Sequence, residues 1–216
     1  MISLNDNERI LFQGDSITDG ARGRDEDLNH IMGHGYQYIV AAKLHADNID
    51  KNISIFNRGV SGNRISDLYG RWVEDAIHLN PTILSILIGV NDAGWAYVDK
   101  SGSSPKRYEK IYRLMLDEIL ENNKELKLVI MEPFVIESQN DEKLKYMAAY
   151  IKELQLVARK LADEYGAAFV PLQSMFDEMK DKSKQLLVWD GIHPTIVGHE
   201  LIARKWLEVV ENKFYR

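Results

Sequence analysis

The stretch that most limits the possible folds is residues 82–88, with the sequence TILSILI. Nearly every residue in it is apolar, and turn signals flank it, Asn80-Pro81 before and Gly89 after. A strand that is apolar on both sides must be covered on both sides, as a central strand of a parallel sheet is. The stretch is too short to cross a bilayer. It therefore predicts a sheet with helices on both faces.

Segments with strand and helix patterns alternate along the rest of the chain. The predicted strands are 10–12, 53–56, 82–88, 127–131 and 167–170, and the predicted helices are 36–44, 65–77, 108–122, 144–165, 174–182 and 195–212. Residues 21–34 and 93–105 are predicted to be loops. Because no hairpin signal joins two strands, the strands should pair in parallel through right-handed crossovers. We predict one three-layer α/β domain over residues 1–216, with about five parallel strands.

Composition and charge exclude several classes of function. The chain has 45% hydrophobic and 28% charged residues, as soluble globular proteins do. Its net charge of −6 argues against nucleic acid or an anionic membrane as the main partner. The absence of cysteine rules out disulfides and thiol nucleophiles. No basic segment followed by a long apolar one marks a secretory signal, so we expect a soluble, cytoplasmic protein.

Polar clusters follow the predicted strands, at the edge where α/β sheets bind ligands. The clusters are Asp15-Ser16, Ser61-Gly62-Asn63, Asn91-Asp92 and the pair Asp190 and His193. A serine hydroxyl is a poor nucleophile unless a base takes its proton, and imidazole is the usual base. A carboxylate then has to fix the imidazole tautomer, and three residues separate Asp190 from His193. This spacing allows the carboxylate to fold back on the ring.

Acyl transfer also needs hydrogen-bond donors where the oxyanion forms. Gly62 can offer a backbone N–H that no side chain covers, and Asn91 can offer its side-chain amide. The backbone N–H of Ser16 is a third candidate donor. The sequence therefore supplies a nucleophile, a base, an orienting carboxylate and oxyanion donors.

The blocks GDSITDG, VSGN, GVND and DGIHP, in this order, resemble the four sequence blocks of SGNH hydrolases, also called the GDSL esterase and lipase family. The resemblance extends over nearly the whole chain. It implies a flavodoxin-like fold and esterase chemistry, with Ser16 as nucleophile, His193 as base and Asp190 as the residue that orients the base. It also implies an oxyanion hole formed by Ser16, Gly62 and Asn91. We expect neither a metal nor a cofactor.

Within this family, the chain is most similar to intracellular bacterial carbohydrate acetylesterases, which include acetylxylan esterases. The similar stretches are NRGVSGNRISDL, RWVEDAI, GVND and WDGIHP followed by GHELIARKWL. The similarity implies removal of acetyl groups from xylo-oligosaccharides, and assembly as a homo-oligomer. Aromatic faces suit sugar rings, so Trp189, Trp95 and Tyr97 are candidate substrate-binding residues. Ordinary packing is the alternative role for each.

Other interpretations of the same residues stay open. Ser16 alone could be a turn residue or a helix N-cap, and Asp15 and Asp92 are expected to be structural. Asp190 and His193 could bind a metal, although no third ligand lies at a suitable spacing.

Two other functions also remain possible. A general short-chain lipolytic esterase or thioesterase would share the fold, although the polar loops favour a short acyl group. A binding module could instead cradle a phosphate in the GDSITDG turn, but this turn is poor in glycine and carries aspartates that repel anions.

Overall fold

The computed structural model describes residues 2–25, 27–138, 140–179 and 185–216. Its centre is a five-stranded sheet with the strand order β2-β1-β3-β4-β5, and all neighbouring strands are parallel. The strands are β1 (Arg9–Gly14), β2 (Ser54–Asn57), β3 (Ile83–Leu87), β4 (Lys127–Met131) and β5 (Ala168–Val170). The middle strand, β3, is buried at every residue, as its apolar sequence predicts. The prediction of a parallel sheet of about five strands is confirmed.

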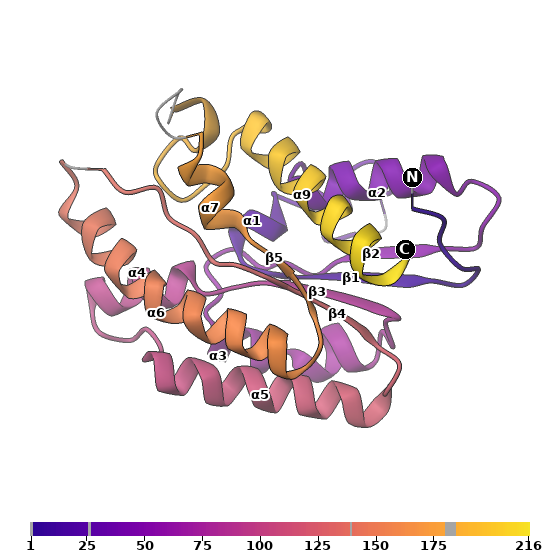
Figure 1. The fold of residues 1–216 in the computed structure, drawn as a ribbon, viewed down its shortest axis with the longest axis horizontal. Helices are drawn as coiled ribbons and strands as arrows, with labels where there is room; N and C mark the ends of the chain where they lie inside the picture. Colours follow the sequence, from indigo (N-terminus) through magenta and orange to yellow (C-terminus); the bar gives the residue numbers. More distant parts are fainter. Residues whose placement is uncertain (1, 26, 139, 180–184) are drawn as a thin grey trace.

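Helices cover both faces of this sheet and give three layers (Figure 1). On one face α2 (Tyr36–Asp47) packs against α9 (Ile196–Phe214). On the other face lie α3 (Ile65–Tyr69), α4 (Val90–Val98), α5 (Pro105–Asn122) and α6 (Glu142–Glu164). Two short helices, α1 (Ser16–Asp19) and α7 (Leu172–Asp177), follow β1 and β5 directly. The fold is therefore a three-layer α/β/α sandwich.

Side-chain caps fix where the long helices begin. The Ser104 hydroxyl accepts a hydrogen bond from the backbone of Arg107 at the start of α5, and Pro105 occupies the first helical position. The Asp141 carboxylate caps α6 in the same way. Thr195 caps α9, which begins directly after the loop that carries the C-terminal candidate residues. The last cap therefore helps to place that loop.

Large aromatic side chains fill the spaces between the layers. Trp206 of α9 is fully buried against Phe12 of β1, with ring centroids 5.4 Å apart. Its indole N–H donates a hydrogen bond of 2.9 Å to Ser85, the single hydroxyl inside β3. This bond explains how a polar residue is tolerated within the central apolar strand, because its hydroxyl has a buried partner.

The helical predictions are wrong in two places. The predicted helix 65–77 is divided, because α3 ends before Gly70 and a π-helix, η1 (Val73–Ile77), follows. The predicted loop 93–105 is helical in its first half, where α4 extends to Val98. Only a few small apolar residues of α4 are buried, so the sequence pattern was weak there.

The remaining element bounds agree with the sequence to within a few residues. Helix α7 starts two residues earlier than predicted, and residues 180–182 of that prediction lie outside the described part of the chain. In the ranges that the structure describes, no helix has the length and apolar character needed to cross a membrane.

Candidate active site

Ser16 lies in a tight turn between the end of β1 and the start of α1. Asp15 accepts a hydrogen bond of 3.0 Å from the backbone of Ile17, which makes Asp15 the N-cap and Ser16 the first helical residue. The interpretation of Ser16 as an N-cap is therefore wrong, because Asp15 occupies that position. A Cβ at Gly14 would lie 2.4 Å from the backbone oxygen of Leu87, so only glycine fits before this turn.

The loop before α9 brings His193 and Asp190 to Ser16, as the sequence predicts. The Ser16 Oγ lies 2.8 Å from Nε2 of His193, and Nδ1 of the same ring lies 2.7 Å from Oδ2 of Asp190. The second carboxylate oxygen of Asp190 accepts bonds from the backbones of Ile192, at 3.0 Å, and His193, at 2.7 Å. The three side chains thus form an unbroken hydrogen-bonded chain with the serine hydroxyl at one end.

The hydrogen bonds to Asp190 also determine its charge. Burial alone raises the pKa of this carboxyl, but the bonds from the backbone and ring of His193 and from the backbone of Ile192 outweigh burial. The pKa of Asp190 therefore lies below its ordinary value. The carboxylate stays ionised at neutral pH and can hold a proton on the facing Nδ1.

The loop after β2 lies beside Ser16 and carries Gly62. The backbone N–H of Val60 donates to the Gly14 oxygen at 3.1 Å, and that of Ser61 donates to Asp19 at 2.9 Å. Gly62 itself has a φ of +84° and is exposed, which suits a residue whose N–H faces a ligand. The role of Asp19 escaped the sequence analysis, although this residue belongs to the same block as Ser16.

The third predicted oxyanion donor, Asn91, lies in the first turn of α4. Its side-chain amide donates one hydrogen bond of 3.1 Å to the backbone oxygen of Asn63, next to Gly62 in the chain. An amide nitrogen carries two hydrogens, so this bond fixes its orientation and leaves the second hydrogen for a ligand. The predicted oxyanion donors therefore stand on neighbouring, hydrogen-bonded segments.

The two buried aspartates beside the site bind the backbone, as predicted. Asp92 is fully buried and accepts bonds from the backbones of Ile65, at 3.0 Å, and Ser103, at 3.2 Å. Burial raises the pKa of Asp92 to about 6 and that of Asp15 to about 7. Asp15 holds the turn that carries Ser16, and Asp92 joins the start of α3 to the segment after α4.

The three candidate substrate-binding aromatics have different surroundings. The Trp189 ring stacks on the His193 ring with centroids 6.2 Å apart, and 69% of the residue is exposed. Trp95 lies one helical turn after Asn91 and lines a pocket that Gly62 also lines. Tyr97 packs on Tyr146 of α6, with ring centroids 5.4 Å apart. Trp189 thus contacts the predicted base, and Trp95 shares a pocket with a predicted oxyanion donor.

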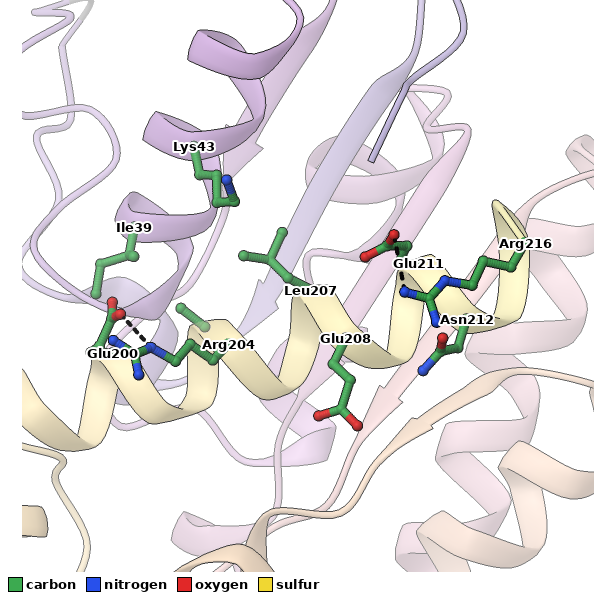
Figure 2. Close-up of a pocket in the computed structure, with 10 residues that line it drawn as sticks. Ile39, Lys43, Glu200, Arg204, Leu207, Glu208, Glu211, Asn212 and Arg216 are labelled. Atoms are coloured by element: carbon green, nitrogen blue, oxygen red, sulfur yellow. Dashed lines mark hydrogen bonds and ion pairs between the residues drawn. The ribbon is translucent and has the colours of Figure 1, made fainter. Parts of the chain in front are cut away.

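A second hollow, of about 540 Å³, lies between α2 and α9. Figure 2 shows the residues that line it. Ile39 and Leu207 belong to its apolar lining, and Arg204 pairs with Glu200 at 2.7 Å along its edge. None of the candidate catalytic residues lines this hollow. Within the described ranges, no group of three His, Asp or Glu side chains could hold a metal ion.

Comparison with known proteins gives independent evidence on the family of the chain. Residues 12–201 match the model of the GDSL-like lipase/acylhydrolase family. The chain belongs to this family. The GDSL-family chain is 33% identical to an acetylxylan esterase of Geobacillus stearothermophilus, over 100% of this chain and 99% of that protein. It is 26% identical to an isoamyl acetate-hydrolyzing esterase of Saccharomyces cerevisiae, over 97% of this chain and 88% of that one.

A solved structure supports the same relationship. A catalytic mutant of the acetylxylan esterase from Geobacillus stearothermophilus superposes on the GDSL-family chain with a TM-score of 0.83 and 32% identity. The match covers 96% of this chain and 95% of the other. These relatives show that the protein is a carboxylic-ester hydrolase. Its fold is the one that its sequence blocks predicted.

Proposed function

We propose that this GDSL-family hydrolase is a serine acetylesterase that removes acetyl groups from carbohydrates, above all from acetylated xylo-oligosaccharides. The observation that carries the proposal is the hydrogen-bonded chain from Ser16 through His193 to Asp190, with steps of 2.8 Å and 2.7 Å. The preference for acetylated sugars rests on the full-length similarity to an acetylxylan esterase.

In the proposed reaction, the Ser16 oxygen attacks the ester carbonyl carbon while Nε2 of His193 takes the hydroxyl proton. The carbonyl oxygen gains the negative charge and accepts hydrogen bonds from the backbones of Ser16 and Gly62 and from the Asn91 amide. When the tetrahedral intermediate collapses, the alcohol leaves with the proton from His193 and an acetyl group stays on Ser16. Water, activated by the same imidazole, then releases acetate and restores the serine.

Asp190 acts through the imidazole in this scheme. Its Oδ2 faces Nδ1 of His193, so the neutral ring carries its hydrogen on Nδ1 and leaves Nε2 free to accept the serine proton. The same carboxylate stabilises the imidazolium that forms during each half-reaction. The low pKa of Asp190 keeps it charged for both tasks.

Replacing Asn91 by alanine is expected to reduce kcat by about 10²- to 10³-fold, because one oxyanion donor is lost. Asn91 is half-buried, and among the described residues its side chain donates to one backbone oxygen, that of Asn63, so the fold should survive the change. Steady-state kinetics with nitrophenyl acetate, together with a thermal melt, separates the two effects. A variant that turns over near the wild-type rate would remove Asn91 from the oxyanion hole.

Substrate assays test the proposed specificity. Acetylated xylo-oligosaccharides should release acetate with the wild-type enzyme and not with Ser16→Ala. Among acetyl, butyryl and octanoyl nitrophenyl esters, kcat/KM is expected to fall as the acyl chain lengthens. A preference for the octanoyl ester would instead favour a general lipolytic esterase, and activity on acyl thioesters alone would favour a thioesterase.

The cytoplasmic location and the homo-oligomeric assembly are further parts of this proposal. Both rest on the similarity to intracellular carbohydrate acetylesterases. Large apolar side chains stand exposed near the candidate site, among them Trp189 and Ile196, and such side chains are common in protein interfaces. Light scattering in solution tests the assembly, and the mass of a single chain would contradict it.

A further inference from the structure

An open pocket of about 300 Å³ adjoins the candidate oxyanion hole. Its lining consists of Gly62, Arg64, Asp67, Trp95 and Ser101. Gly62 belongs to both the pocket and the oxyanion hole. A Cβ built on Gly62 would meet nothing within 4 Å, so the space above this residue is open. A substrate held at Ser16 can therefore extend into the pocket without any movement of Gly62.

One wall of the pocket is a fixed polar network. The guanidinium of Arg64 donates from Nε and Nη2 to the two carboxylate oxygens of Asp67, at 2.8 Å and 3.1 Å. Its Nη1 donates to the backbone oxygen and the hydroxyl of Ser101, at 3.0 Å and 3.1 Å. The Arg64 and Asp67 side chains are still 27% and 35% exposed. They thus present charged groups in one fixed arrangement to anything in the pocket.

Trp95 gives the pocket an apolar wall beside this polar one. It stands four residues after Asn91 on α4, so both side chains lie on the same side of the helix. Trp95 is 42% exposed, although it is one of the largest apolar residues in the chain. A bare aromatic face next to a network of donors and acceptors matches a ring that has apolar C–H faces and hydroxyl edges.

The pocket is built in advance of any ligand. Buried Asp92 binds the backbone of Ile65, at the start of α3, and the backbone of Ser103, in the segment that also carries Ser101. Tyr150 of α6 donates a further bond of 2.9 Å to the Ser103 oxygen. The two sides of the pocket are therefore tied to one buried carboxylate. A preformed site loses less conformational freedom when it binds.

We propose that this pocket is a subsite for a hydroxylated ring of the substrate, a pyranose that stacks on Trp95 and bonds to the Arg64–Asp67 pair through its hydroxyls. The inference rests on the proposed function and names the part of the substrate that this side of the site receives. A long acyl chain suits the pocket poorly. It would remove water from the exposed faces of Arg64 and Asp67 and offer no hydrogen bonds in return.

The test compares a sugar ester with an ester of a small alcohol. For each variant, kcat/KM is measured with acetylated xylobiose and with ethyl acetate, and the ratio of the two is the readout. Trp95→Ala is expected to lower this ratio about tenfold, mainly through KM on the sugar, because a stacking face is lost. Trp95→Tyr keeps an aromatic face and should stay within about threefold of wild type.

The matched control is Tyr38→Ala. Tyr38 is 48% exposed, similar to Trp95, but lies on α2, which covers the other face of the sheet from α4 (Figure 1). For Tyr38→Ala, the ratio of kcat/KM on acetylated xylobiose to kcat/KM on ethyl acetate should equal that of the wild type. Thermal melts of all the variants show whether any of them is misfolded.

Each contrary outcome has its own meaning. If the wild type deacetylates xylobiose and Trp95→Ala leaves the ratio unchanged, the subsite is wrong while the proposed function stands. If Trp95→Ala instead changes the preference between ethyl acetate and ethyl butyrate, the pocket holds the acyl group and the subsite is again wrong. If the wild type cleaves ethyl acetate and no acetylated sugar, both the proposed substrate and the subsite are wrong.

Discussion

Replacing Ser16 by alanine is expected to lower kcat for every ester substrate by about 10⁵-fold or more, as loss of the nucleophile does in other serine hydrolases. The change removes one hydroxyl from a half-buried position and leaves His193 and Asp190 bonded to each other. Rates with nitrophenyl acetate measure the loss. The melting temperature should stay within about 4 °C of the wild type, because no apolar contact is deleted.

A matched control for this variant is Ser66→Ala. Ser66 is also half-buried, but it lies on α3 and outside the hydrogen-bonded chain. Its activity should remain close to that of the wild type. Residual turnover by Ser16→Ala at a tenth of the wild-type rate would mean that another group attacks the ester.

Replacing Asp190 by asparagine is expected to reduce kcat by about 10⁴-fold, with little change in stability. One carboxylate oxygen of Asp190 accepts two backbone N–H groups, from Ile192 and His193, and the other faces the ring nitrogen Nδ1. The oxygen of an asparagine side chain will take the first position, because an amide nitrogen there would face two donors. Its NH₂ group then donates to Nδ1 and forces the hydrogen onto Nε2, which can no longer accept the serine proton.

The ring itself provides the measurement for this variant. Nitrogen chemical shifts of His193 should show the hydrogen on Nδ1 in the wild type and on Nε2 in Asp190→Asn. Asp47→Asn removes the same charge from a surface pair with Lys43 and serves as the control, with rates expected near those of the wild type. Full activity of Asp190→Asn, or an unchanged tautomer, would show that Asp190 does not orient the base.

The sheet could be predicted from the sequence because each strand is a short apolar run between turn signals. The run 82–88 places β3 at the centre, and the structure confirms it. Helix α4 was missed because it follows a glycine N-cap, Gly89, with a φ of +130°, and buries few residues. A helix that is held mainly by packing on α6 leaves little periodicity in its own sequence.

The candidate site was easier to predict than its surroundings. Ser16, Gly62, Asn91 and His193 stand in four short blocks, and the order of the four blocks along the chain made their chemistry recognisable, although one block alone would be a weak signal. Arg64 and Asp67 pair locally at the start of α3, but the bonds of Arg64 to Ser101 depend on how this helix start meets the segment after α4. No pattern within either segment encodes that contact, so the pocket lined by Arg64, Asp67 and Trp95 emerges only from the structure.

Covalent labelling tests most directly whether Ser16 is the nucleophile of this GDSL-family hydrolase. A fluorophosphonate reacts with an activated serine and stays attached, and mass spectrometry of the digested protein locates it. We expect one label per chain, on the peptide that contains Ser16, with none on Ser16→Ala and much slower labelling of His193→Ala. An active wild-type enzyme that remains unlabelled, or that carries the label on another residue, would contradict the assignment of Ser16.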